Sequence, residues 1–246
     1  MNGNAMKRHL KKWLILSFAA FICLAQTGNA GAASSPTLGD ILERTETYYK
    51  KLHAFTSYFR QWTTSSAASA MTTEASGKLY YQKPRQMRWE YELPEPQSFV
   101  ANQRLAWLYE PNEKQITLFD ATRFFASPLA QAFFDGMVEL KKNFEVNLDP
   151  KQSNKAVAVL KLVPKQEDPN IKELFLWIEM ETYRITSIES RDALGNINRI
   201  MLDSQTAVDS LDSKLFQLDA SPTTTVLDAE GRVLEPAEVE KLKGKQ

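Results

Sequence analysis

Few residues of this chain have the types and spacing that catalysis or metal binding would need. The sequence contains two histidines and a single cysteine, Cys23. It contains no zinc-binding Cys/His spacing and no HExxH, GxSxG, P-loop or GxGxxG pattern. Glu90 and Glu92 alternate with aromatic residues, which is typical of a solvated strand face rather than of a catalytic carboxylate pair. These features disfavour an enzyme, and we expect neither a metal ion nor a cofactor.

The chemistry that remains is the binding of apolar groups by large side chains. Between residues 77 and 119, aromatic and aliphatic residues alternate with polar ones in short runs, which Pro and polar residues separate. Such runs predict an antiparallel meander with one very apolar face. An ordinary core would explain this face, but the flexible Met87 and a neighbouring apolar insert favour a ligand cavity. The predicted cavity residues are Leu79, Tyr81, Met87, Trp89, Tyr91, Phe99 and Trp107.

The insert follows the meander and has helical rather than strand spacing. Residues 120–140 hold large apolar side chains at three- and four-residue steps. Ser127 and Pro128 fit the cap and first position of a helix, and Gly136 fits its end. We therefore expect a short helical lid over the cavity. Its predicted apolar residues are Phe124, Phe125, Leu129, Phe133 and Phe134.

The remaining elements must position this face and its lid. An apolar stripe predicts a helix over residues 38–52, which Thr37 would cap together with Asp40. About eleven strands follow, separated by turn residues. The predicted fold class is mainly β (α+β): a curved, incomplete antiparallel β-barrel with an N-terminal helix and a short helical lid over an apolar cavity.

The ends of the chain differ in composition from the rest. Residues 1–33 combine a basic start, an apolar run and small residues, which predicts a cleaved secretory signal peptide. Residues 34–246 are expected to form a single domain whose tail, from about residue 228 to residue 246, is polar and mobile. Without the leader, 26 basic residues face 30 acidic ones, and a net charge of −4 disfavours nucleic-acid binding. We expect a monomer.

Several short motifs together resemble those of one known family. Residues 77–84, GKLYYQKP, followed by Trp89, are similar to a signature of that family. Phe55, Phe59 and Gln61 resemble its early "F…F.Q" strand. Its other motifs are matched by residues 106–111 (AWLYEP), by residues 127–129 in the lid region, and by residues 214–216 (KLF) followed by Pro222. In this order and spacing the motifs resemble those of the periplasmic outer-membrane lipoprotein carriers of the LolA type, and the resemblance covers nearly all of the chain after the leader.

The resemblance implies a function that composition alone does not. Members of this family shelter the acyl chains of lipoproteins, take them from an inner-membrane ABC transporter and deliver them to an outer-membrane receptor. It also implies a periplasmic location and a latch that hydrogen-bonds lid carbonyls, with Lys83 at the position where the family often has Arg. Three alternatives remain open: a periplasmic sensor of lipids or lipoproteins, a carrier of other lipids, and a hydrolase. We expect Trp89→Glu to abolish cargo binding without unfolding the protein.

Overall fold

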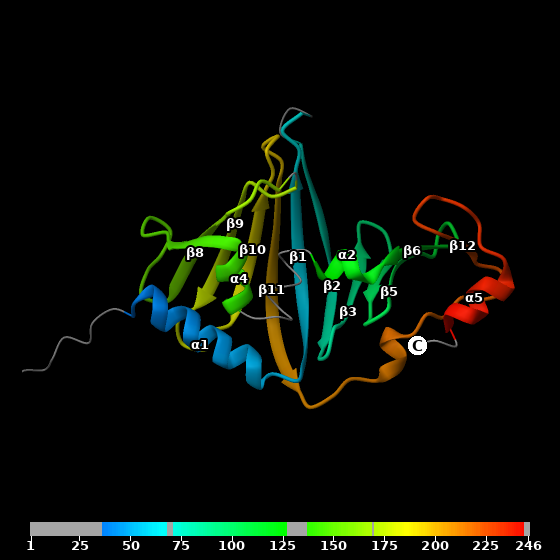
Figure 1. Ribbon diagram of the computed structural model, residues 1–246, viewed down its shortest axis with the longest axis horizontal. Coiled ribbons are helices and arrows are strands. Elements are labelled where there is room, and N and C mark those ends of the chain that lie inside the picture. The colour runs from blue at the N-terminus through cyan, green and yellow to red at the C-terminus, as the bar shows by residue number, and fades with distance from the viewer. Residues whose placement is uncertain (1–35, 68–70, 127–136, 169, 244–246) are drawn as a thin grey trace, which may run out of the picture. The chain divides into compact units, whose positions relative to one another are not determined.

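The alternating runs of the sequence build one sheet of twelve strands (Figure 1). The computed structural model describes residues 36–67, 71–126, 137–168 and 170–243. The helical elements are α1 (Leu38–Lys51), α2 (Ala121–Phe125), α4 (Met137–Asn143), the 3₁₀ helix η1 (Ser213–Phe216) and α5 (Pro236–Lys243). The strands are β1 (Ala54–Thr64), β2 (Thr72–Gln82), β3 (Gln86–Leu93), β4 (Gln97–Ala101), β5 (Leu105–Glu110), β6 (Gln115–Asp120), β7 (Phe144–Leu148), β8 (Val157–Pro164), β9 (Glu173–Glu179), β10 (Ile185–Arg191), β11 (Ile197–Val208) and β12 (Thr225–Leu227).

The order of the strands leaves the sheet open. It runs β12-β6-β5-β4-β3-β2-β1-β11-β10-β9-β8-β7, so β12 and β7 are its two edges. Every pairing is antiparallel except that of β12 with β6, which is parallel. The prediction of a mainly β, incomplete barrel is confirmed, with twelve strands instead of about eleven. The extra strand, β12, comes from the segment just before the predicted polar tail.

Helix α1 forms as its sequence predicts. The Thr37 side chain accepts a hydrogen bond from the Asp40 backbone N–H, and the Asp40 carboxylate accepts one from the Thr37 backbone N–H, which completes a capping box. The apolar stripe of the helix, including Ile41, Leu42 and Tyr49, is buried against the sheet. Among the described residues, no helix is long and apolar enough to cross a membrane.

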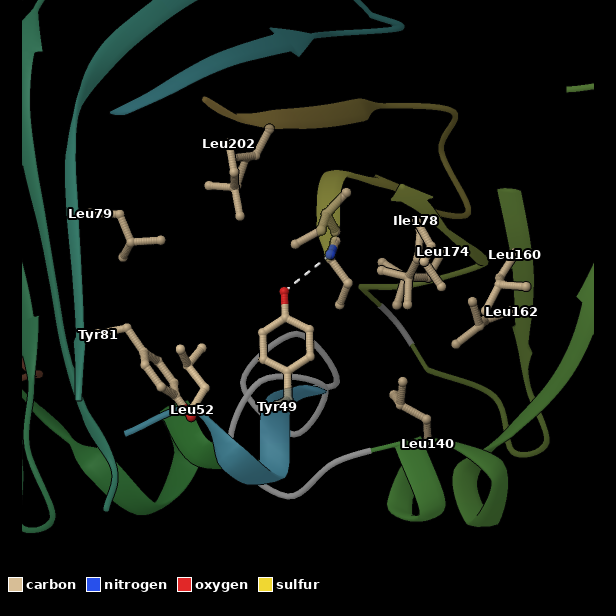
Figure 2. Close-up of a cluster of buried hydrophobic side chains, with 14 of the residues drawn as sticks. Tyr49, Leu52, Leu79, Tyr81, Leu140, Leu160, Leu162, Leu174, Ile178 and Leu202 are labelled. Atoms are coloured by element: carbon tan, nitrogen blue, oxygen red, sulfur yellow. Dashed lines mark hydrogen bonds between the residues drawn. The ribbon is translucent and has the colours of Figure 1, made fainter. Parts of the chain in front are cut away.

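One face of the sheet, here called the inner face, carries the main core. Directly paired residues of neighbouring strands share a face, and register therefore places Phe55, Leu79, Trp89, Leu176 and Leu202 together on it. Helix α1 and Leu140 of α4 cover this face. Figure 2 shows the Tyr49 side chain reaching from α1 into the cluster, where its hydroxyl oxygen accepts a hydrogen bond from the Ile185 backbone N–H at 3.1 Å.

The opposite, outer face has a second core over β4, β5 and β6. Trp107 and Ile116 from the sheet pack there against side chains that follow β11, namely Phe216, Leu218, Val226 and Val239. Val239 is buried although it belongs to α5, within the segment that was predicted to be a mobile polar tail. The composition of residues 228–243 is polar, as predicted, but the segment folds back on the sheet instead of extending into solvent.

Candidate functional site

An apolar concave site lies at the β4–β6 end of the sheet, mainly on the inner face. It is a pocket of about 660 Å³ between β4, β5, β6, α2 and the loop at residues 228–230. Its walls are mainly apolar, and carboxylates lie along one side. The lining residues are Phe99, Ala106, Leu108, Leu118, Phe119, Asp120, Phe124, Asp228, Ala229 and Glu230.

Helix α2 places Phe124 over this pocket. The helix begins directly after β6, where the Asp120 carboxylate accepts a hydrogen bond from the Thr122 backbone N–H at 2.8 Å. The ring of Phe124 then packs on Phe99, with 5.0 Å between the ring centroids. Both rings are half-buried at the rim of the pocket.

Phe125, the next residue of α2, holds the helix to the sheet. It is buried among Ala101, Ala106 and Ala121, and its ring lies 5.0 Å from that of Phe124. The small alanine side chains leave room for it on the inner face. The guanidinium of Arg85 stacks over its ring at 5.2 Å. Phe125 thus anchors α2, whereas Phe124 faces the pocket.

The other part of the predicted cavity is filled by the protein's own side chains. Tyr81 stacks on Phe55 with 5.0 Å between centroids, and Trp89 packs edge-on against Phe59 at 4.8 Å. Leu79, Tyr81, Met87 and Trp89 are all buried in the core that α1 covers. The structure therefore changes the expectation for Trp89→Glu, because a carboxylate at this buried position would destabilise the fold.

Tyr91 lies on the same face at the border between packed and open regions. Its ring contacts Phe59, and its hydroxyl group donates a hydrogen bond to the Gln61 side-chain oxygen at 3.0 Å. Partial burial raises the pKa of the Tyr91 hydroxyl above its usual value. Tyr91 is therefore a neutral, half-buried residue of the inner face, packed against the main core and not among the residues that line the pocket.

The placement of Trp107 corrects one sequence prediction. Register pairs it with Val100 and Leu118, whereas the inner-face Phe99 pairs with Leu108. Trp107 therefore packs in the outer-face core with Phe216. The prediction that it lines the same cavity as Trp89 was wrong, because the turn between β4 and β5 sets which residues of β5 face inward.

Lys83 also has a different setting from the one predicted. Its ammonium group donates hydrogen bonds to the backbone carbonyls of Tyr49, at 2.6 Å, and Lys50, at 3.2 Å. Both carbonyls belong to the last turn of α1, so in the structure described Lys83 holds α1 rather than the insert. Partial burial lowers the pKa of Lys83 below its usual value.

Several pocket residues were not predicted. Ala106 and Leu108 face inward because they alternate with Trp107, and this signal was present in the sequence once the face of β5 was known. Nothing local indicated residues 228–230, which reach the pocket from the far end of the chain. The predicted lid residues Leu129, Phe133 and Phe134, and the predicted helix signals at 127, 128 and 136, lie outside the described residues. The described residues contain no cluster of His, Cys, Asp and Glu that could hold a metal ion.

Two relatives found by sequence agree with the motifs. An outer-membrane lipoprotein carrier protein from Halorhodospira halophila is 23% identical over 90% of this chain and 97% of its own length. One from Methylococcus capsulatus is 28% identical over 58% of this chain and 67% of its own length. The crystal structure of an uncharacterized conserved protein from Thermus thermophilus aligns with a TM-score of 0.49 at 12% identity, covering 77% of this chain and 98% of that one.

A family profile matches more than half of the chain. The profile described as "Outer membrane lipoprotein carrier protein LolA" matches residues 50–219, a span that runs from the end of α1 through η1 and includes the pocket strands β4, β5 and β6. The chain therefore belongs to the LolA family of outer membrane lipoprotein carrier proteins.

Proposed function

We propose that this protein is a periplasmic carrier that shelters the acyl chains of lipoproteins in water. The observation that carries the proposal is the pocket of about 660 Å³, whose rim is made by the half-buried Phe99 and Phe124. Its volume falls within the range of about 300–1,000 Å³ that is usual for small-molecule sites. Family membership supports the same function, because two relatives that cover most of their own length in the alignment are named as carriers.

The physical need for such a pocket follows from the cargo. Each methylene group of an acyl chain gains about 0.8 kcal/mol when it leaves water for an apolar environment. Acyl chains would enter between β5 and α2 and separate Phe124 from Phe99. Longer chains would then advance toward Tyr91 and displace half-buried side chains at the open end of the inner face. Because one apolar filling replaces another, the net energy of binding stays small enough for the cargo to be released.

The packed half of the inner face would stay in place as a scaffold. There α1 is held by the Lys83 ammonium group at its last turn and by the Tyr49–Ile185 hydrogen bond. We propose that Leu79, Tyr81, Met87 and Trp89 form the floor toward which the acyl chains advance. Phe124 is the described residue that we assign to the movable lid.

The route of transport is part of the proposal. The carrier would receive acylated lipoproteins from an inner-membrane ABC release complex and pass them to the outer membrane, where a receptor would accept them. Residues 1–33 would direct export and be removed, so that the working protein begins near residue 34. No step of this cycle requires catalysis by the protein.

The test is complex formation with matched cargo. The exported protein is incubated with a triacylated lipoprotein and, separately, with its unacylated form, and native mass spectrometry measures the complexes. We expect a one-to-one complex with the acylated form alone. Equal binding of both forms, or binding of neither, would contradict the proposal. Binding of free phospholipid or glycolipid in place of lipoprotein would favour a carrier of other lipids.

A matched pair of variants assigns the site. Phe124→Asp places a charge at the rim of the pocket, and we expect it to abolish complex formation. Tyr58→Asp is the control, because Tyr58 is an aromatic residue with 55% exposure on the outer face, where Lys78 stacks on its ring. The control should bind cargo like the wild type. Equal loss in both variants would remove the inner-face pocket from the proposal.

A further inference from the structure

The outer face of the sheet has a pocket of its own, separate from the one proposed for acyl chains. It has a volume of about 340 Å³ and lies over β9, β10 and β11, which are neighbours in the sheet (Figure 1). Register places Trp177, Ser187 and Met201 together on this face, opposite the main core. We call it the outer pocket, and every residue that lines it belongs to the part of the chain that the structure describes.

Two β-bulges lie at the outer pocket. In β10, Thr186 is an extra residue that the ladder with β9 skips. In β11, the register with β1 shifts next to Ser204, whose φ of 52° is uncommon for a residue other than glycine. Bulges change the direction of side chains and are frequent next to functional sites. Both residues line the outer pocket, so the two strands depart from regular pairing where the pocket lies.

Arg199 brings a positive charge to the outer pocket. Its guanidinium carbon lies 4.7 Å from the centre of the Trp177 ring. Its buried Nε atom has no hydrogen-bond partner among the described residues. The carboxylate opposite it in register, Glu189, is bound by Arg191, with 2.6 Å between Nη2 and Oε1. Because buried polar groups are nearly always hydrogen-bonded, the unpaired N–H of Arg199 indicates a missing partner.

Covering an aromatic ring would not by itself explain this unpaired charge. The neighbouring cations on the outer face of these strands each have a carboxylate partner, whereas no ion pair joins Arg199 to another described residue. The pairs are Arg60 with Asp203 at 3.2 Å, Lys161 with Glu173 at 2.6 Å, Arg184 with Glu179 at 3.0 Å and Arg191 with Glu189 at 2.6 Å. The charges of these pairs cancel, so this group of residues keeps one unbalanced positive charge, that of Arg199.

A single carboxylate matches this charge and this geometry. The planar guanidinium group can bind a carboxylate through two parallel hydrogen bonds. Val157 and Met201 line the same pocket and offer apolar surface beside Arg199. A phosphate monoester carries nearly two negative charges at neutral pH, which one cation does not balance. The volume lies near the lower limit of about 300–1,000 Å³ that is usual for ligand sites, which suits a short polypeptide segment.

We propose that the outer pocket binds a carboxylate of a partner polypeptide, at its C-terminus or on an acidic side chain, next to an apolar residue. This inference goes beyond the proposed carrier function, because it concerns a second site with a different ligand. The outer pocket and the acyl-chain pocket are lined by different residues of different strands. A partner could therefore dock on the outer face while cargo occupies the inner face.

The first test is an NMR titration of the exported, isotope-labelled protein. The indole N–H of Trp177 reports on the outer pocket, and Trp177→Phe identifies its signal. The probes are acetyl-leucyl-leucine, its neutral amide, acetyl-leucyl-aspartyl-leucinamide and inorganic phosphate. We expect a saturable shift with one or both carboxylate peptides, which tells a terminal from a side-chain carboxylate, and none with the neutral amide. No shift with either carboxylate peptide, an equal shift with the amide, or tighter binding of phosphate would overturn the inference.

A matched pair of variants assigns the binding to Arg199. Arg199→Gln should weaken peptide binding about tenfold or more, the ratio expected for losing a charged hydrogen-bond partner. Lys161→Gln is the control, because it also removes a cation from an aromatic ring, that of Phe175 at 5.8 Å, and leaves Arg191 beside Glu173. The control should bind like the wild type, and equal weakening in both variants would overturn the inference.

A second substitution keeps the test independent of folding. Arg199→Lys retains the charge but loses the planar fork, so it should bind more weakly than the wild type and more tightly than Arg199→Gln. The same NMR spectra show whether each variant is folded, and Arg199→Lys carries the test if Arg199→Gln is not. Unchanged binding by a folded Arg199→Gln variant would overturn the inference. The carrier proposal would remain intact, since it is tested by cargo binding.

Discussion

The two ends of the inner face differ in how tightly they are packed. Under α1 and α4, residues such as Phe55, Leu79 and Leu176 are buried with almost no exposure. At α2, by contrast, Phe99 of β4 and Phe124 of the helix itself remain half-buried beside a pocket of about 660 Å³. Among the described residues, this apolar surface is thus fully packed at one end and has a pocket beside it at the other.

We assign stability to the packed end and the proposed binding of acyl chains to the open end. In a densely packed core any loss of side-chain volume lowers the stability of the fold. We therefore expect the packed end to hold the curvature and register of the sheet. A loosely packed end forfeits some of that stabilisation but can accept an apolar guest without unfolding the rest. The same residue type should therefore have opposite roles at the two ends, and this can be tested with phenylalanine.

The largest expected effect on stability is that of Phe55→Ala. Phe55 is buried and stacks on Tyr81, so its truncation should lower the free energy of unfolding by about 3–5 kcal/mol. Phe124→Ala removes the same side chain at the open end and should cost about 1 kcal/mol while reducing cargo binding. Urea unfolding and native mass spectrometry measure the two effects. Equal losses of stability would show that both ends belong to one uniform core.

Gly77→Ala should have the next largest effect. Gly77 lies on β2, and a Cβ atom there would come within 1.9 Å of the Glu90 backbone oxygen on β3. Because backbone cannot move aside as a flexible side chain can, we expect a loss of about 1–3 kcal/mol in unfolding free energy. Gly231→Ala is a useful contrast: open space surrounds that position, so any loss there comes from its positive φ of 84° alone. A Gly77→Ala variant as stable as the wild type would contradict the close approach of β2 and β3.

Lys83→Met should have the smallest effect on global stability. It removes two charge-assisted hydrogen bonds to the last turn of α1, and because the side chain is only partly buried we expect a loss of about 1 kcal/mol. The local effect should be larger, with faster amide hydrogen exchange in α1. If exchange in α1 stays at the wild-type rate, Lys83 does not hold the helix.

Much of the fold could be predicted because local signals agreed with it. The cap at Thr37 and Asp40 located the start of α1, and the helix predicted over residues 38–52 spans Leu38–Lys51 in the structure. Period-two alternation also identified which residues within a strand share a face. These features depend on neighbours in the sequence, which a single chain displays directly.

Relations between distant segments could not be predicted in the same way. Trp107 was assigned to the cavity because it is large and apolar, yet the side chains that bury it follow β11, about 100 residues later in the chain. Residues 228–243 were predicted to be a polar tail because most of their side chains are polar. Only a few of their side chains, Val239 among them, bury the segment against the sheet. Both errors have one cause. Whether a strand face is buried, and in which core, depends on the segment that covers it, and here that segment is remote in the sequence.

Acyl chains are proposed to bind at the open end of the inner face, and photocrosslinking can locate them there. A triacylated lipopeptide with a photoreactive diazirine in its acyl chains is irradiated with the exported protein, and mass spectrometry identifies the modified residues. We expect modification at Phe99, Leu108 and Phe124, and little on the outer face. Modification centred on Tyr58 or Trp177 of the outer face, or none on the protein, would contradict binding at this end.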